Sequence, residues 1–283
     1  MAVPVTDLQA TPAQRAAEIE VELLLDGLFQ LYGFDFRGYE RATIRSKFVE
    51  FMRKRGLKTF SALQDCVFHD GLAAEALLLS LAKRRTSLFD NAAAFRSLRE
   101  MIGPLLRSYP LPRIWVAECT SPEEVFSVAI LLEEASLLHK AEIYVTCSNP
   151  ALLHQAREGR FDRERLPEYE KNYLEGGGTA DFADYWIMQD GKGEFRPELV
   201  RKVTWCESNL ITDTSFNEFQ MIICRNQLVE FGAVLRRRIL ALLEGSLVQF
   251  GLLHTDVVDE LHAVPFSLNY KALSVQHGIY QRN

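Results

Sequence analysis

RIWVAECTSPEEVFSVAILLEE, residues 113–134, joins an apolar strand to a helix through a short polar turn. The strand is expected over 113–117, and Pro122 with the two glutamates after it begins a helix that carries an apolar stripe. Units of this kind hold a ligand against the N-terminus of the helix. Their turns normally contain glycine, because the ligand approaches the backbone. Here the turn 118–122 reads ECTSP and has no glycine.

The bulk composition is that of an ordinary globular chain. Its 283 residues suit one large domain or two modest ones, with 48% apolar and 25% charged residues. A net charge of −6 gives no general attraction to nucleic acid or anionic membranes. No apolar run approaches the roughly 18 residues of a membrane span, and the N-terminus lacks the pattern of a signal peptide. We therefore expect a cytoplasmic protein without nucleic-acid binding or membrane insertion.

The cysteines give no sign of a metal site or a disulfide framework. They are odd in number and contain no C-x-x-C pair, so we expect reduced thiols and no bound metal. The five are Cys66, Cys119, Cys147, Cys206 and Cys224.

The N-terminal third is predicted to be helical. Residues 1–14 are expected to be a flexible tail and residues 15–80 a helical domain, because helical periodicity runs through AAEIEVELLLDGLFQLYG and FRGYERATIRSKFVEFMRKRG. The second of these helices is a basic island in an acidic protein, with Arg41, Arg45 and Arg53 among its cations. It is either a solvated helix face or a docking surface for an acidic helical partner.

Residues 84–283 alternate short apolar strands with helices, which indicates a mostly parallel sheet covered on both faces. One stretch departs from the alternation, and we predict a small antiparallel β insertion at about 176–205. The fold class is therefore α/β, with a helical N-terminal domain. Strands are expected at 113–117, 142–147, 202–208, 219–224 and 246–253, and helices at 122–138, 150–158 and 231–244.

Three segments in order carry a family resemblance: TSLFDNAAAF (86–95), IWVAECTSPEEVFSVAILLEE (114–134) and FQMIICRNQLVEF (219–231). With them the chain resembles the CheR family, chemoreceptor glutamate methyltransferases that use S-adenosylmethionine. The likeness covers almost the whole chain. It implies a helical N-terminal domain, a Rossmann-like methyltransferase domain and a small β-subdomain inserted in the latter.

Six family positions are retained. The resemblance implies that five bind the cofactor and that Arg225 is catalytic if the chain is active. Each also has a structural interpretation: Glu124 suits the first turn of a helix, Arg225 suits an ion pair, and the asparagines suit bonds to loop backbone. The five cofactor positions are Thr86, Glu124, Asn209, Leu210 and Asn226.

Four positions depart from the family in ways that would disable the site. Asp90 stands where the family has an arginine, so the charge is reversed. Glu118 replaces a glycine and is expected to meet the methionine end of the cofactor, and Cys147 removes the acid expected to bind the ribose. Glu230 replaces a tyrosine near the transferred methyl group.

Two functions remain open. The losses fall together on the expected site while the framework persists, which favours a catalytically impaired CheR-like protein. It would act as a signalling or binding protein and would not bind S-adenosylmethionine with useful affinity. The alternative is an active protein-glutamate O-methyltransferase of chemoreceptor-like proteins, with S-adenosylmethionine as cofactor and S-adenosylhomocysteine as product.

Overall fold

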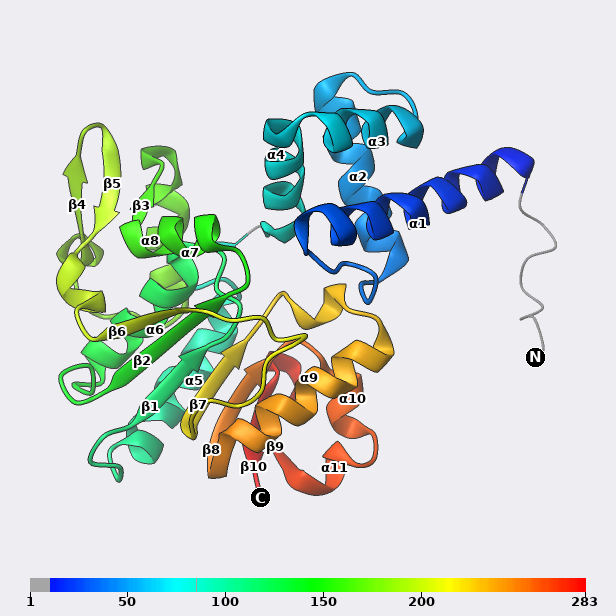
Figure 1. The fold of residues 1–283 in the computed structure, drawn as a ribbon. Coiled ribbons are helices and arrows are strands. Elements are labelled where there is room, and N and C mark those ends of the chain that lie inside the picture. Colours follow the sequence, from blue (N-terminus) through cyan, green and yellow to red (C-terminus); the bar gives the residue numbers. More distant parts are fainter. Residues whose placement is uncertain (1–10, 85) are drawn as a thin grey trace. The chain divides into compact units, whose positions relative to one another are not determined.

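The computed structural model describes residues 11–84 and 86–283, which form two compact units (Figure 1). The helical unit comprises the chain up to Ala82 together with Glu230–Gly232. The α/β unit comprises Lys83–Val229 and Ala233–Asn283. None of the helices formed by these residues is long and apolar enough to cross a membrane.

Four helices build the helical unit: α1 (Pro12–Tyr32), α2 (Arg41–Arg55), α3 (Phe60–His69) and α4 (Gly71–Ala82). Thr11 and Gln14 form a capping box at the start of α1, which explains why this helix begins at Pro12. Residues 12–14 are therefore helical, although a tail was expected there, and residues 1–10 lie outside the described part of the chain. Gly33 and Gly56, both in the left-handed region, end α1 and α2.

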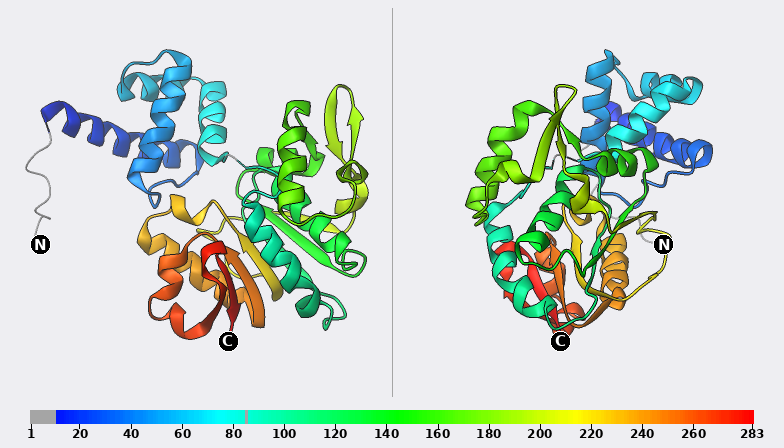
Figure 2. Two further views of the ribbon diagram at one scale, coloured as in Figure 1. Left: turned by 180° about the vertical axis from the view of Figure 1, so that it is seen from behind. Right: turned by 90° about the vertical axis from the view of Figure 1, so that its left-hand side faces the viewer.

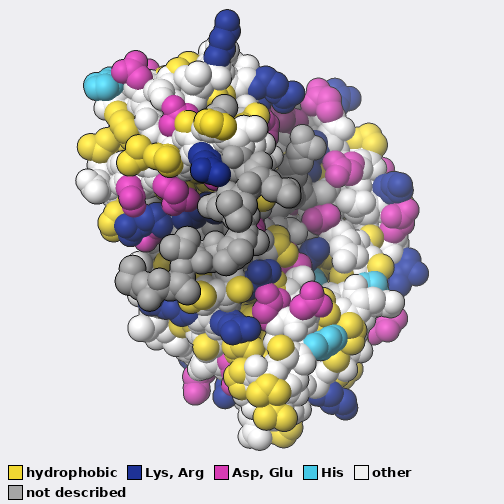
Figure 3. Space-filling view, turned by 90° about the vertical axis from the view of Figure 1, so that its right-hand side faces the viewer, with side chains coloured by type: hydrophobic (Ala, Val, Ile, Leu, Met, Phe, Trp, Pro, Cys, Tyr) yellow, Lys and Arg dark blue, Asp and Glu magenta, His cyan; other side chains and the backbone are white. Residues whose placement is uncertain are grey.

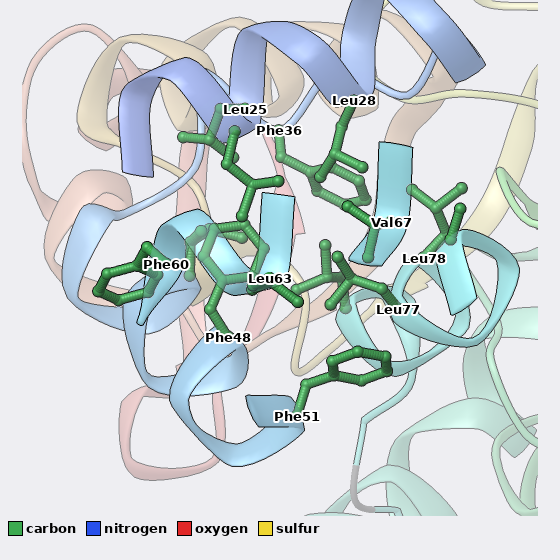
Figure 4. Close-up of a cluster of buried hydrophobic side chains, with 14 of the residues drawn as sticks. Leu25, Leu28, Phe36, Phe48, Phe51, Phe60, Leu63, Val67, Leu77 and Leu78 are labelled. Carbon is green, nitrogen blue, oxygen red and sulfur yellow. The ribbon is translucent and has the colours of Figure 1, made fainter. Parts of the chain in front are cut away.

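The core of the helical unit is built from leucines and aromatic side chains that meet between the four helices (Figure 4). Leu25 and Leu28 come from α1, Phe48 from α2, Leu63 from α3 and Leu77 from α4, and all five are fully buried. This burial stabilises the bundle, because each such side chain contributes about 1.5–3 kcal/mol when it leaves water.

A seven-stranded sheet forms the centre of the α/β unit, in the order β6-β2-β1-β7-β8-β10-β9. The first five strands in this order are parallel. Only β10 runs against the others, because it is antiparallel to both β8 and β9. The strands are β1 (Arg113–Val116), β2 (Glu142–Cys147), β6 (Val203–Glu207), β7 (Phe219–Cys224), β8 (Leu247–Thr255), β9 (Tyr270–Ser274) and β10 (Ile279–Arg282).

Helices cover both faces of this sheet (Figures 1 and 2). The chain leaves β1 for β2 in one direction and leaves β7 for β8 in the other, so right-handed connections place α6 (Pro122–Glu134) and α9 (Ala233–Ser246) on opposite faces. The strand order therefore reverses between β1 and β7, which is where such folds bind ligands. The remaining helices are α5 (Ala92–Leu106), α7 (Pro150–Glu158), α8 (Leu166–Glu175), α10 (Val258–His262) and α11 (Phe266–Asn269).

A separate three-stranded antiparallel sheet has the order β3-β5-β4. The hairpin of β4 (Trp186–Gln189) and β5 (Lys192–Phe195) lies inside the predicted insertion, whereas β3 (Arg160–Phe161) precedes it. Phe161 lies over Gly193, where an added Cβ would meet the ring at 2.2 Å. Glycine is needed there because the ring lies on the backbone. The predicted fold class is confirmed.

Candidate ligand site at the strand ends

The turn after β1 is held between the two neighbouring strands. The amide of Ala117 donates to the carbonyl of Ile223 on β7 at 2.9 Å, and the amide of Cys119 donates to the carbonyl of Thr146 on β2 at 2.8 Å. Between them Glu118 has a φ of 52°, in the left-handed region that favours glycine. The backbone thus keeps a glycine-type conformation although the residue is a glutamate.

The side chain of Glu118 points to the end of β2. Its Oε1 accepts hydrogen bonds from the hydroxyl of Ser148 and, at 3.2 Å, from the backbone amide of Ser148. Sγ of Cys147 lies 4.0 Å from the same oxygen. The residue is only 3% exposed, and Nη1 of Arg84 donates to its carbonyl oxygen at 3.2 Å. The carboxyl group of Glu118 is therefore directed toward the end of β2, next to Cys147 and Ser148.

Burial raises the pKa of both Glu118 and Cys147. It raises the pKa of Glu118, against the opposing effect of Arg84. It raises the pKa of Cys147 to about 12, and the adjacent carboxylate of Glu118 raises it further. Cys147 is therefore a neutral thiol beside the carboxyl group.

Five of the residues singled out in the sequence converge on one small cavity of about 30 Å³ between the ends of β1 and β7. The turn and the two strands bring them together from segments far apart in the chain. They are Thr86, Asp90, Glu124, Arg225 and Asn226.

Most of these side chains also support the local structure. Thr86 donates to the hydroxyl of Ser121 at 2.6 Å, and Oε2 of Glu124 accepts the amide of Thr120 at 2.7 Å. Burial raises the pKa of Glu124, although Arg84 opposes this. The bond to Thr120 agrees with the structural interpretation of Glu124 as an acid in the first turn of a helix.

The far wall of the cavity contains the C-R-N run. Nη1 of Arg225 donates to the backbone carbonyl of Asp90 at 2.8 Å, and its guanidinium lies over the ring of Phe95. The amide of Asn226 donates to Asp256 at 2.8 Å. The Asp90 carboxylate makes no hydrogen bond or ion pair with the described residues, and Asp90 lines both this cavity and a larger one. Asp90 is thus an acidic residue of the cavity wall whose side chain has no partner among the described residues.

Asn209 and Leu210 lie in the loop after β6 and do not line either of the two cavities described here. Oδ1 of Asn209 accepts a hydrogen bond from the backbone amide of Ile211 at 2.9 Å. The backbone amide of Asn209 donates to the Asp213 carboxylate at 2.9 Å. Leu210 is buried. The preceding residue, Ser208, donates its amide to the carbonyl of Cys147 at 3.2 Å, which ties the loop to the end of β2.

Glu230 belongs to the helical unit. Its carboxylate forms an ion pair with Lys47 of α2 at 2.7 Å, and the two side chains are only 12% and 18% exposed. Lys47 also donates to the carbonyl of Leu81 at 2.6 Å. Glu230 therefore has a structural partner on a helix.

The basic residues of α2 differ in their environments. Arg41 binds Glu22 of α1 through two guanidinium nitrogens, one of them at 2.9 Å. Arg45 and Arg53 are exposed, and their guanidinium groups make no hydrogen bond or ion pair with the described residues. Exposed Val49 lies between them at helical spacing. On the face drawn in Figure 3, cations and carboxylates are interspersed without a large field of one sign. The two free arginines thus form a local basic stripe.

A larger cavity of about 700 Å³ adjoins the small one and shares Thr86, Ser87 and Asp90 with it. Arg84, a buried cation at the entrance to this region, was not singled out from the sequence, although the run Lys83-Arg84-Arg85 directly before Thr86 was a visible signal. Arg165 pairs with buried Glu123 in its wall. Among the described residues no group of His, Cys, Asp and Glu is arranged to hold a metal ion.

Two family models cover nearly all of the sequence. Residues 84–268 match the model "CheR methyltransferase, SAM binding domain", and residues 19–82 match "CheR methyltransferase, all-alpha domain". The chain belongs to the CheR methyltransferase family. The boundary between the two matches falls where the helical unit gives way to the α/β unit.

Curated relatives agree with this assignment. The chain is 36% identical to "Putative methyltransferase Cher3" of Pseudomonas putida over 96% of its own length and 99% of the relative's. It is 24% identical to "Chemotaxis protein methyltransferase 1" of Pseudomonas aeruginosa, over 94% and 98% of the two chains. Among solved structures it is similar to the N-methyltransferase NodS of Bradyrhizobium japonicum, at 11% identity and a TM-score of 0.37, over 70% and 88% of the two chains.

Proposed function

We propose that this CheR-family protein is a catalytically impaired cytoplasmic signalling protein that acts by binding an acidic helical partner. The observation that carries the proposal is that Asp90 lines the small cavity and its carboxylate has no partner among the described residues, at a position where the family resemblance implies a cation. S-adenosylmethionine carries a carboxylate at its methionine end, and we infer that this end is no longer held.

The size of the effect supports this inference. Two like charges about 4 Å apart repel by about 1 kcal/mol in bulk water and about 4 kcal/mol at the effective dielectric of a protein surface. A micromolar ligand has about 8 kcal/mol of binding free energy in all. Arg225 is a cation in the wall of the small cavity, but its Nη1 already donates to the Asp90 carbonyl.

The residue at the family tyrosine position supports the same proposal. Glu230 is paired with Lys47, so its carboxylate is engaged in holding the helical unit together. It supplies neither the aromatic ring nor the hydroxyl of a tyrosine. We therefore infer that the reaction centre has lost a group in addition to the cation at position 90.

The partner is assigned to the stripe of Arg45, Val49 and Arg53 on α2. Free cations beside an exposed apolar side chain are suited to an acidic amphipathic helix, since the cations provide attraction and the valine provides apolar contact. Arg41 is a weaker candidate for this surface because Glu22 already binds it.

Calorimetry with S-adenosylhomocysteine tests the impairment directly. We expect a dissociation constant well above 10 μM, and weaker binding still for S-adenosylmethionine. A value below about 10 μM would falsify the proposal. The second candidate function is then the active protein-glutamate methyltransferase.

That second candidate has one observation in its favour. Thr86, Glu124, Arg225 and Asn226 converge on one cavity although they come from distant segments. Methyl transfer to a carboxylate depends mainly on proximity and alignment, so an enzyme tolerates the loss of a tyrosine better than the loss of its cofactor. Transfer of a labelled methyl group to a chemoreceptor fragment would establish this function.

A further inference from the structure

Two of the departures from the family, Glu118 and Cys147, lie next to each other at the ends of neighbouring strands. Glu118 follows β1 and Cys147 ends β2. The Sγ atom of Cys147 lies 4.0 Å from Oε1 of Glu118, and both residues are buried. Glu118 introduces a carboxylate after β1, and Cys147, beside it, stands where the family has a carboxylate at the end of β2. The two substitutions occupy a single site.

We propose that Glu118 supplies, from β1, the carboxylate that the end of β2 lacks, and that it accepts the ribose hydroxyls of a nucleoside whose 5′ substituent carries no carboxylate. This inference rests on the proposed function, in which the methionine end of the cofactor is not held. It assigns a ligand class to the strand ends where Glu118 and Cys147 meet.

The hydrogen bonds of Glu118 leave one oxygen for a ligand. Oε1 accepts both bonds from Ser148, which fix the direction of the carboxylate. Oε2 accepts no hydrogen bond from the described residues. A carboxylate is an acceptor only, and a vicinal diol offers it two donors. In Rossmann-type folds an acid at the end of the second strand bonds to the ribose in this way.

The substitutions at positions 118 and 147 depend on each other, because two carboxylates side by side in this buried site would repel. An aspartate at position 147 would place a second carboxylate close to that of Glu118, and two carboxylates sharing a site repel. The thiol of Cys147 avoids this conflict, since burial and Glu118 raise its pKa to about 12 and keep it neutral. The positive φ of Glu118 is also kept, so the turn retains the shape that brings it to the end of β2.

The other end of the ligand is restricted by Asp90. Asp90 lines both the small and the large cavity, and Arg225, which also lines the small one, donates to its backbone carbonyl. A neutral 5′ substituent meets no repulsion there, whereas an amino-acid carboxylate does. The chemistry therefore favours a nucleoside with an uncharged 5′ group.

Titration calorimetry with two probes tests the proposal. The first is 5′-methylthioadenosine, which is neutral, and the second is S-adenosylhomocysteine, which adds a zwitterionic amino acid to the same thioether nucleoside. We expect the natural protein to bind the first at least tenfold more tightly than the second. The 2′-deoxy analogue of methylthioadenosine, which lacks the diol, should bind at least tenfold more weakly than its parent.

Four variants examine the exchange itself. Glu118→Gln keeps the shape and removes the charge, and should weaken methylthioadenosine binding by about ten- to a hundredfold. Cys147→Asp should weaken it through repulsion, and Glu118→Gly should remove the acceptor. The double variant Glu118→Gly with Cys147→Asp should bind within about threefold of the natural protein, because it returns one carboxylate to the same place.

The possible outcomes distinguish a failure of the role assigned to Glu118 from a failure of the proposed function. If Glu118→Gln binds as tightly as the natural protein, or if no variant with native circular dichroism binds either nucleoside, the role of Glu118 is overturned. If the natural protein binds S-adenosylhomocysteine as tightly as methylthioadenosine, the exclusion of carboxylates fails and the proposed function fails with it. In that case the affinity of the natural protein for methylthioadenosine, relative to that of Glu118→Gln, still tests whether Glu118 accepts the ribose hydroxyls.

Discussion

Lys47 and Glu230 form an ion pair with an N–O distance of 2.7 Å, although 183 positions separate them in the chain. The pair joins α2 to the Glu230–Gly232 segment, which is part of the helical unit. Both side chains are largely buried, so the ion pair offsets part of the cost of removing each charge from water.

Replacing Glu230 by Gln should destabilise the protein by about 1–3 kcal/mol, because the buried ammonium of Lys47 loses a charged hydrogen-bond partner. The double variant Lys47→Met with Glu230→Leu should recover most of this loss, since apolar residues of similar size replace both charges. Urea unfolding of Lys47→Met, Glu230→Leu and the double variant measures the coupling. Additive effects would show that the pair is not coupled.

The basic stripe on α2 should bind the partner through Arg45 and Arg53. Their replacement by Glu should reduce binding of a purified acidic helical chemoreceptor fragment at least tenfold, while the free energy of unfolding changes by less than about 1 kcal/mol. Arg237 and Arg238 of α9 are matched controls, because they are also exposed and their replacement by Glu gives the same change in net charge. Equal losses in the two double variants would assign the effect to net charge.

The cysteines should differ in their reactivity toward an aromatic disulfide reagent at pH 8. Cys119, Cys147 and Cys224 are buried, and burial raises the pKa of each thiol above its ordinary value. Because the thiolate is the reactive form, these three should react only after unfolding. Cys66 and Cys206 are partly exposed and should react first. Mass mapping of the modified sites identifies them, and early modification of Cys147 would contradict its placement.

Glu118 should make the stability of the protein depend on pH. Its pKa is raised in the folded state by burial, so above about pH 4.5 the folded state holds its proton longer than the unfolded state does. Stability therefore falls as the pH rises through this range. Glu118→Gln does not ionise, so its stability relative to the natural protein should increase between pH 4.5 and pH 8. Urea unfolding at both pH values measures this difference, and a constant difference would mean that the carboxyl group is not buried.

Periodicity was sufficient to predict the framework, for a physical reason. Parallel strands buried on both faces are short apolar runs, and those of β1, β2 and β7 were predicted to within one residue of their ends. The pair β9 and β10 was not predicted, because strands such as Tyr270–Ser274 carry exposed polar positions and lack a continuous apolar run. The helix α6 ends at Glu134, earlier than the expected 138, because Ser136 adopts a positive φ.

The sequence indicated several residues that meet in the small cavity, but it did not give the directions of their side chains. The segments that carry Thr86, Glu124 and Arg225 were identified, since the family pattern marks them. The direction of the Glu118 side chain depends on its φ and on the amide of Ser148, and neither can be read from residue types. For the same reason the ion pair of Glu230 with Lys47 was not foreseen, because it joins segments with no local relationship.

The decisive substitution for the proposed function is Asp90→Arg. It returns a cation to the wall shared by the two cavities, where the natural protein has an unpaired carboxylate. A ligand carboxylate then gains a charge-assisted hydrogen bond in place of a repulsion, and one such bond contributes about 1.5–3 kcal/mol. We expect the affinity for S-adenosylhomocysteine to rise at least tenfold, measured by calorimetry.

Asp90→Asn is the matched control for this change, because it removes the negative charge without adding a positive one. Its affinity for S-adenosylhomocysteine should lie between those of the natural protein and Asp90→Arg. The affinity for 5′-methylthioadenosine should stay within about threefold in both variants, since that ligand has no carboxylate to interact with position 90. If Asp90→Arg leaves the binding of both ligands unchanged, the side chain at position 90 does not face the ligand, and the impairment must be explained by another residue.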